Sequence, residues 1–380
     1  MKVSGDWIRN PATQSVCRML EQAGFQALFV GGCVRNALLG LAVSDLDLAT
    51  DARPETVSKL AKNAGLRCIP TGIDHGTVTV MAHGISHEIT TFRRDINTDG
   101  RHAVVAFSTS VAEDAQRRDF TMNALYARGS GEVLDPLGGL PDVLSRRVRF
   151  VGVPAARISE DYLRILRFFR FQAWYGDPSN GLDAEGLAAC AANIAGLETL
   201  SAERIGAEMR KLLSAPDPAF AVSVMGLSGV LAAVLQGADT KALPVFLHLA
   251  ADLPRDWIVR LVVLGGADPT ERLRLSRVES AKYRLVRDEI GSLRRPAELA
   301  YRLGAAQAAQ IVLARSALME SPPPKDWRAD IAMGGQAVFP VAAADLMPAL
   351  QGPVLGEKLR VLEARWIDSG FELSKDQLLS

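Results

Sequence analysis

Two aspartates one residue apart, Asp45 and Asp47, stand in the otherwise apolar segment SDLDLAT at residues 44–50. We expect a strand here, in which residues i and i+2 point to the same face, about 6–7 Å apart along the chain. Two like charges so placed repel each other unless a cation lies between them, and Mg²⁺ binds through carboxylates and substrate phosphates. Two such ions can stabilise the attacking and leaving oxygens of a phosphoryl transfer. The alternative is a solvated edge strand with two surface aspartates, because so short a motif matches many unrelated sequences.

A glycine-rich segment, LFVGGCVRNALLG at residues 28–40, stands directly before the aspartates. It predicts a strand, a turn at Gly31 and Gly32, and a helix that contains Arg35. Backbone N–H groups at a helix N-terminus bind phosphates, and a guanidinium offers a fork of donors to phosphate oxygens. The segment contains neither GxGxxG nor GK[ST], so we expect neither a Rossmann turn nor a P-loop.

Two later segments carry charges that suit the same chemistry. Glu88 lies in HEITTFRRD, a predicted strand, and is either a third carboxylate of the site or an exposed strand residue. Arg117, Arg118 and Asp119 lead into an apolar stretch, a pattern that is also typical of a salt-bridged helix start.

A third segment, SEDYLRILRFFRFQAWYG, predicts a single helix with Ser159 as its N-cap and Gly176 after its end. Arg164, Arg167 and Arg170 recur in it at a spacing of three and form a slowly winding basic stripe. The alternative to a binding role is the solvated basic face of an amphipathic helix.

The elements that must position these residues change along the chain. Short runs rich in Val, Ile, Thr and Phe alternate with helical patterns over the first 150 residues, and PETVSKLAKNAG is typical of a helix with Pro at its start. Strand patterns end near Ile158, so we predict an α+β protein: an N-terminal α/β domain followed by helices alone. Residues 218–238 carry no charge and are long enough for a membrane span. The GLSG within them instead predicts a helix end and a new buried helix.

Composition sets outer limits on the function. The chain has 380 residues, which suggests two or three domains, and 43 basic side chains balance 43 acidic ones. A net charge of zero does not exclude nucleic acid, because local clustering of charge decides such binding. Four scattered cysteines are typical of reduced thiols in a cytosolic protein. The opening MKVSGDWIRNP lacks the apolar region of a signal peptide, so we expect a cytoplasmic protein without a membrane partner.

Taken together, the motifs resemble those of the class II tRNA nucleotidyltransferase and poly(A) polymerase family. They occur in the family's order: FVGGCVRNALLG, SDLDLAT, HEITTFR, RRDFTMNAL, DPLGGLPDV, VRFVG and EDYLRILRFFRF. LSAERIGAEMRKLL is similar to the RNA-binding neck of the family. The likeness is dense over residues 28–213 and thin beyond about 240, and it is strongest to the mitochondrial type of CCA-adding enzyme, including DGRHA at 99–103.

The resemblance implies a nucleotidyltransferase head, similar to polymerase beta, at residues 1–152. A helical neck with base-recognition and RNA-binding helices would follow at 153–238, and a tRNA-binding body and tail at 239–380. It implies template-independent addition of CCA to the 3′ end of tRNA from CTP and ATP, by Mg²⁺-dependent attack of the 3′-hydroxyl on the α-phosphate. A poly(A) polymerase, or an enzyme adding only C or only A, would share every motif. Outside these enzymes the alternatives are an RNA-binding protein that kept the fold, or an oxidoreductase, against which the missing GxGxxG counts. The oligomeric state stays open.

The same resemblance assigns roles to the catalytic and phosphate-binding residues. Asp45 and Asp47 match the Mg²⁺ ligands, and Glu88 matches a further carboxylate of the site. Gly32 and Arg35 match positions that hold the triphosphate.

Other residues match the nucleotide-binding motifs of the family. Arg118 and Asp119 match the motif that contacts ribose and phosphate, beside Asn123. Asp161 and Arg164 match the pair that hydrogen-bonds the edge of the incoming base. Two further matches follow on the same segment: Arg167 and Arg170.

Two more observations bear on RNA and on switching between nucleotides. INTDGRHA, residues 96–103, matches a flexible loop of the family that is linked to the switch from C to A addition. Asn36 replaces the usual Asp of the family, with a minor effect expected because an amide also accepts hydrogen bonds. Candidates for contacts with tRNA phosphates are Arg204, Arg210, Lys211 and the run ERLRLSRVESAKYR at 271–284.

Overall fold

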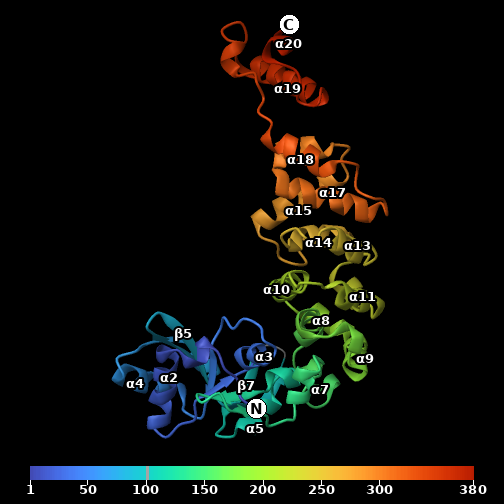
Figure 1. Cartoon of the computed structure of the whole chain (residues 1–380). Helices are drawn as coiled ribbons and strands as arrows, with labels where there is room; N and C mark the ends of the chain where they lie inside the picture. Colours follow the sequence, from blue (N-terminus) through green and yellow to red (C-terminus); the bar gives the residue numbers. More distant parts are fainter. Residues whose placement is uncertain (100–101) are drawn as a thin grey trace. The chain divides into compact units, whose positions relative to one another are not determined.

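The computed structural model describes residues 1–99 and 102–380, and it divides into two compact units, residues 1–236 and 237–380 (Figure 1). The first unit contains all the described strands, and the second is helical. The predicted α+β fold is therefore confirmed. The expected division between head and neck at residues 152 and 153 falls inside the first unit and stays a prediction.

The main sheet of the first unit has seven strands in the order β3-β4-β5-β2-β1-β8-β9, and β6 and β7 form a separate pair. The strands are β1 Leu28–Val30, β2 Asp47–Thr50, β3 Arg67–Gly72, β4 Thr77–Ala82, β5 Ile85–Thr91, β6 Arg93–Asp99, β7 His102–Phe107, β8 Tyr126–Arg128 and β9 Val133–Leu134. Among the described strands, β2 and β5 form the one parallel pair, and all other pairs are antiparallel.

Alternation along β4 shows why the sheet has one packed face. Val78, Val80 and Ala82 are buried, whereas the residues between them are half-buried, as expected for a strand with a single core face. Helices α2 (Pro11–Gln22) and α4 (Pro54–Asn63) pack against this strand. The helix predicted for PETVSKLAKNAG is confirmed, with Pro54 in its first turn.

The single helix predicted from Ser159 to Tyr175 is wrong, because the structure divides it. Helix α7 spans Pro154–Glu160 and helix α8 spans Leu163–Tyr175. Asp161 between them has an extended backbone, with φ −156° and ψ 103°. Contacts of its side chain with other segments, described below, hold this break in place.

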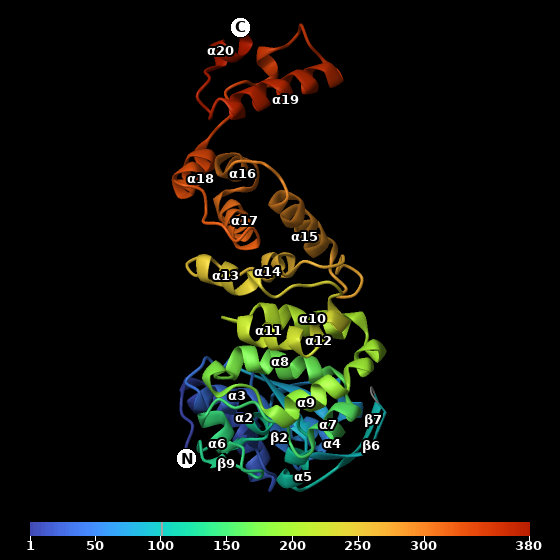
Figure 2. The ribbon, with the colours of Figure 1, turned by 90° about the vertical axis from the view of Figure 1, so that its right-hand side faces the viewer.

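Helix α8 packs against α7, α10 and α11 (Figure 2), and the first unit contains several further helices. The helices of the first unit not yet given are α1 Asp6–Arg9, α3 Gly32–Leu38, α5 Val111–Gln116, α6 Leu140–Leu144, α9 Ala184–Ala192, α10 Ala202–Leu213, α11 Ala219–Leu227 and α12 Val230–Val234. Phe168 of α8 packs on Phe150 and Phe120, with ring centroids 5.4 and 6.4 Å away. Helix α8 therefore shares an aromatic core with the segments before residue 153.

The uncharged stretch at 218–238 forms two helices, as predicted. Gly229, at φ +79°, separates α11 from α12 in a left-handed conformation that glycine adopts readily. In the part of the chain that the structure describes, no helix combines the length and the apolar character that a membrane crossing requires.

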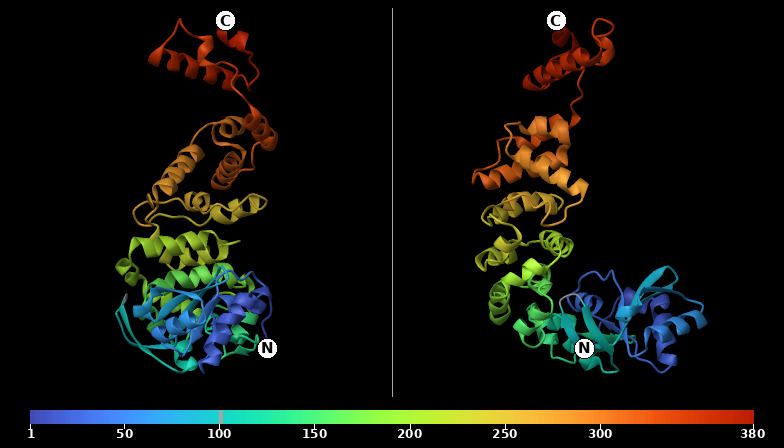
Figure 3. Two further views of the ribbon diagram at one scale, coloured as in Figure 1. Left: turned by 90° about the vertical axis from the view of Figure 1, so that its left-hand side faces the viewer. Right: turned by 180° about the vertical axis from the view of Figure 1, so that it is seen from behind.

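The second unit is helical, and α13 to α16 and α18 pack around α17, whereas α19 packs with α20 (Figure 3). They are α13 Ala242–Leu249, α14 Trp257–Leu264, α15 Arg277–Ile290, α16 Pro296–Leu303, α17 Ala305–Leu318, α18 Trp327–Gln336, α19 Gly352–Asp368 and α20 Lys375–Leu379. An aromatic cluster around Trp366 joins Phe339 and Phe371 to Tyr301 of α16.

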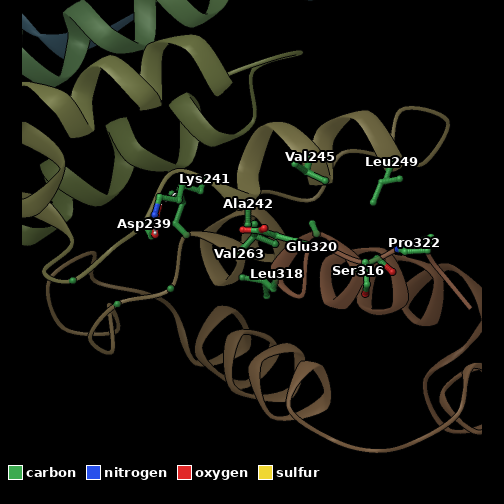
Figure 4. Close-up of a pocket in the computed structure, with 16 residues that line it drawn as sticks. Asp239, Lys241, Ala242, Val245, Leu249, Val263, Ser316, Leu318, Glu320 and Pro322 are labelled. Atoms are coloured by element: carbon green, nitrogen blue, oxygen red, sulfur yellow. Dashed lines mark hydrogen bonds and ion pairs between the residues drawn. The ribbon is translucent and has the colours of Figure 1, made fainter.

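A cavity of about 750 Å³ also lies in the second unit (Figure 4). Asp239, Lys241 and Glu320 contribute its charged groups, and Asp239 and Lys241 pair at 3.9 Å. None of the predicted site residues lines this cavity, and all of them lie in the first unit.

Candidate active site

Three carboxylates, those of Asp45, Asp47 and Glu88, lie near one another where β2 begins. Asp47 opens β2, and the parallel ladder places it opposite Glu88 of β5. Leu46 and Leu48 are buried on the other side of the chain. The prediction that Asp45 lies inside the strand is wrong: it precedes β2, exposed, because neither ladder of β2 extends back to it.

The charges around Asp47 work against its ionisation. Partial burial first, and then the charges of Glu88 and Asp45, raise its pKa to about 6, whereas Arg118 acts in the opposite direction. A hard cation with oxygen ligands fits such a crowded set of carboxylates. Among the described residues, no three His, Cys, Asp or Glu side chains already surround a common metal position. A cation held by Asp45 and Asp47 would therefore take its other ligands from water or substrate.

The glycine turn lies beside this group. Gly31 has φ +69°, which favours glycine, and its amide donates to the Leu125 carbonyl at 3.2 Å. A Cβ at position 31 would lie 3.6 Å from Nη1 of Arg118, so the turn and this guanidinium are close neighbours. Gly32 then opens helix α3.

Arg35 of α3 is buried and engaged with protein groups. Its guanidinium lies 3.9 Å from the ring centroid of Tyr175 and donates to the hydroxyl of that residue at 2.8 Å. It also donates to the side-chain carbonyls of Asn36 and Asn123. Burial lowers the pKa of Arg35. The side chain thus ties α3 to the end of α8.

Asn36 has both of its amide functions satisfied. Its Oδ1 accepts from Arg35, which is the acceptor role expected at this position. Its Nδ2 donates to the Ala42 carbonyl at 2.9 Å, a bond that an aspartate could not make.

Arg118 is held by two residues that the sequence motifs did not single out. Its Nη2 donates to Asp114 at 2.9 Å, and its Nε donates to the Tyr126 hydroxyl at 3.0 Å. Asp114 is almost fully buried, and Arg118 and Arg117 lower its pKa against the effect of burial. The i, i+3 and i, i+4 spacing of Asp114 to the two arginines was the signal in the sequence that could have identified it.

Asp119 uses both carboxylate oxygens on protein partners. Oδ1 accepts from the Phe120 amide at 2.8 Å and from Asn123 at 2.9 Å, and Oδ2 accepts from Arg167 of α8. Burial acts to raise its pKa, but the Arg167 charge and these hydrogen bonds prevail and hold the pKa at about 2. Asp119 therefore joins the strand-containing part of the unit to α8.

The basic stripe of α8 is not the solvated face that was one alternative. Arg170 pairs with Glu208 of α10 at 2.5 Å, and Arg164 pairs with Glu160 and donates to the Arg157 and Arg117 carbonyls. The side chains of Arg164 and Arg170 are only 13 % and 12 % exposed.

Asp161 lies between α7 and α8 and is held from both sides. Its Oδ1 accepts from the Leu163 amide at 3.1 Å, and its Oδ2 pairs with Nη2 of Arg204 on α10 at 2.7 Å. The prediction that Asp161 and Arg164 lie on one helix is wrong, but one turn still relates them: the Arg164 amide donates to the Asp161 carbonyl at 3.0 Å.

The structure thus gathers Asp45, Asp47 and Glu88 with the glycine turn and Arg118. Asp119, Arg167 and Arg170 belong to an adjoining ion-pair network with Glu208, in which the two carboxylates are buried. The predicted loop at 96–103 contains Gly100 and Arg101, which lie outside the described residues, so that prediction stays open.

Two family models match the chain. Residues 27–149 match the "Poly A polymerase head domain", and residues 182–241 match the "Probable RNA and SrmB- binding site of polymerase A".

Known proteins with similar sequences share these regions. The mitochondrial CCA tRNA nucleotidyltransferase 1 of Homo sapiens is 41% identical over 201 residues, covering 53% of this chain and 46% of that protein. The CCA-adding enzyme of Lacticaseibacillus paracasei is 41% identical over 204 residues, covering 53% and 50%. The match therefore spans about half the length of these relatives.

Solved structures are similar over nearly the whole chain. The Bacillus stearothermophilus CCA-adding enzyme in complex with CTP has a TM-score of 0.74 at 28% identity, covering 95% of this chain and 94% of that one. The Thermotoga maritima CCA-adding enzyme complexed with tRNA has a TM-score of 0.70 at 15% identity, covering 96% and 92%, and this likeness concerns the fold alone.

Proposed function

Because this chain belongs to the family of CCA-adding tRNA nucleotidyltransferases and poly(A) polymerases, we propose that it adds CCA to the 3′ end of tRNA from CTP and ATP. One observation carries the proposal: the parallel pairing of β2 with β5 brings Asp47 and Glu88 together beside Asp45, next to Arg118 and the glycine turn. Such a group of carboxylates and a guanidinium suits a nucleoside triphosphate with its divalent cation.

We assign the cation to Asp45 and Asp47, and Mg²⁺ is the cation that we propose. When bound, a divalent cation neutralises charge on the attacking and leaving oxygens of a phosphoryl transfer. Glu88 adds negative charge beside Asp47, which favours cation binding. Arg118 presents a guanidinium to the phosphates, and Gly31 and Gly32 leave space for them.

We assign the choice of base to the junction of α7 and α8. A carboxylate accepts from an exocyclic amine, and a guanidinium donates to a ring nitrogen or carbonyl of the base. Cytosine and adenine both present such a pair of groups, and Asp161 and Arg164 offer the complementary pair. This assignment needs no nucleic-acid template, because protein groups alone contact the pairing edge of the base.

The second candidate is a poly(A) polymerase, or an enzyme that adds only C or only A, because these would share the same residues. We further propose a cytosolic location, which is supported by the four free cysteines.

The deciding experiment incubates the protein with tRNA lacking its 3′ CCA, Mg²⁺, and labelled CTP or ATP. We expect two cytidines and one adenosine to be added in order when both nucleotides are present. Long adenosine tracts from ATP alone would identify a poly(A) polymerase. Addition that stops after cytidine, or that requires a tRNA already ending in CC, would identify the partial activities, and no incorporation would contradict the proposal.

A further inference from the structure

Arg118 has two of its three guanidinium nitrogens fixed by buried groups. Nη2 donates to Asp114 Oδ2 at 2.9 Å, and Nε donates to the Tyr126 hydroxyl at 3.0 Å. Nη1, the third, donates to no residue that the structure describes, and it is the atom that lies near the glycine turn at Gly31. The guanidinium therefore has a fixed plane and one nitrogen left for a ligand.

The two holding groups also fix each other. The Tyr126 hydroxyl donates to Asp114 Oδ2 at 2.7 Å, which closes a ring of three hydrogen bonds among Asp114, Tyr126 and Arg118. Oδ1 of Asp114 accepts from Arg117 Nε at 3.2 Å and from the Arg93 amide at 3.4 Å. Tyr126 is fully buried in β8 and Asp114 is 1 % exposed in α5, so neither can touch a substrate.

We propose that Asp114 and Tyr126 are positioning residues, which orient the Arg118 guanidinium so that Nη1 is presented at the glycine turn for the nucleotide triphosphate. The inference rests on the proposed function, since it names the residues that prepare the same site. A rotated guanidinium would no longer present Nη1 at the glycine turn, although its positive charge would be unchanged. Preorganised donors of this kind act by avoiding reorientation when the ligand binds.

Aligning a phosphate ligand affects its binding in the ground state and in the transition state alike. Loss of the Tyr126 hydroxyl should therefore raise KM for CTP while leaving kcat nearly unchanged. We expect Tyr126→Phe to weaken CTP binding by about tenfold to a hundredfold, as misplacement of a binding group does.

A double-mutant cycle separates positioning from general support of the fold. Binding of CTP without tRNA, and KM and kcat for CTP addition, are measured for wild type, Tyr126→Phe, Arg118→Gln and the double variant, each with a melting curve. If Tyr126 acts through Arg118, Tyr126→Phe has no further effect in the Arg118→Gln background. An equal loss in both backgrounds, or wild-type CTP binding by Tyr126→Phe, would overturn the inference.

Two further variants complete the design. Tyr301→Phe is the matched control, because the Tyr301 hydroxyl also donates to a carboxylate, Glu363, at 2.7 Å, but in the second unit. We expect it to leave CTP binding unchanged. Asp114→Asn keeps the shape of the Asp114 side chain. If Tyr126→Phe does not fold, Asp114→Asn replaces it in the double-mutant cycle with Arg118→Gln. If wild type binds CTP but adds nothing to tRNA, the proposed function fails, while the binding cycle still decides the inference.

Discussion

Asp47 is the residue on which nucleotide addition should depend most, because it faces both Glu88 and Asp45 and lies near Arg118. We expect Asp47→Asn and Asp45→Asn to lower turnover by about a thousandfold or more, as the loss of transition-state charge stabilisation does. Binding of tRNA should stay nearly intact. Turnover is measured by CTP addition, and tRNA binding by filter retention.

The control for this prediction is Asp51→Asn. Asp51 follows the other end of β2 and accepts from the Gln26 amide at 2.8 Å. It should keep wild-type turnover. Wild-type turnover by Asp45→Asn or Asp47→Asn would remove these residues from the cation site.

Asp119 gives a prediction about stability and pH. Its pKa of about 2 in the folded protein is below the value of about 3.9 expected in the unfolded chain. The ionised carboxylate therefore stabilises the folded state above about pH 4, by about 2 to 3 kcal/mol, and this contribution is lost as the pH falls from about 4 to about 2.

Asp119→Asn should lower the free energy of unfolding at pH 7 by about 3 kcal/mol, because it also leaves Arg167 without its closest partner. Denaturant unfolding of both proteins at pH 7 and near pH 2.5 provides the measurement. The difference between them should shrink at the lower pH. A difference that does not change with pH would show that the Asp119 charge contributes nothing.

The helices and strands that could be predicted from the sequence are those marked by a pattern of neighbouring residues. β1, β4, β5 and α4 follow from alternation, a glycine turn and a proline at a helix start. The break between α7 and α8 did not follow, because EDYLRILRFF has a helical pattern throughout. A partner on α10, Arg204, pairs with Asp161 there, and no local pattern reveals it.

Site residues that are neighbours in the sequence were predictable, whereas pairs that join distant segments were not. Asp45 and Asp47 are close in sequence, so their proximity was predictable. The partners of Arg167 and Arg170, Asp119 and Glu208, come from segments far along the chain. Sequence spacing therefore suggested a solvated stripe where the fold pairs the arginines with buried carboxylates.

The junction between α7 and α8 supports a prediction about the choice of nucleotide. Asp161→Ala should relax selection, by admitting UTP or GTP or by lowering the use of CTP and ATP, because an unpaired polar group no longer penalises the wrong base. If Asp161 only stabilises the start of α8, the variant should melt at a lower temperature with unchanged preference. Incorporation of all four nucleotides beside a melting curve distinguishes the two.

Asp177→Ala is the matched control for this experiment. Asp177 accepts from the amide two residues on, that of Ser179, at 2.9 Å, just as Asp161 accepts from that of Leu163. Asp177→Ala removes a hydrogen bond between a carboxylate and the amide two residues on, but beyond the C-terminal end of α8. Nucleotide preference should therefore not change.

For the molecule as a whole, a net charge of zero does not show where basic side chains cluster on the surface. Arg277 and Arg284 are exposed on α15 seven positions apart, hence on one face, whereas Arg204, also a candidate for tRNA contact, pairs with Asp161. Binding of tRNA should weaken as salt rises, through counterion release. Replacing both Arg277 and Arg284 with Gln should reduce the slope of log K against log salt by about two.

Lys59→Gln with Lys62→Gln is the control, because these exposed lysines lie on α4 in the other unit. It removes the same charge and should leave the slope unchanged. An unchanged slope for the α15 variant would exclude this face from tRNA binding.

The parallel pairing of β2 with β5 has a consequence for how the protein acquires its activity. Between the two strands the chain first makes α4 and the β3 and β4 strands, so Asp47 and Glu88 meet only by closing a long loop. Contacts between distant positions form slowly, whereas helices assemble through local contacts. During refolding, the helices should therefore regain their circular dichroism before the protein can retain a nucleotide. A chain still emerging from the ribosome would likewise have no paired carboxylates until β5 has been synthesised.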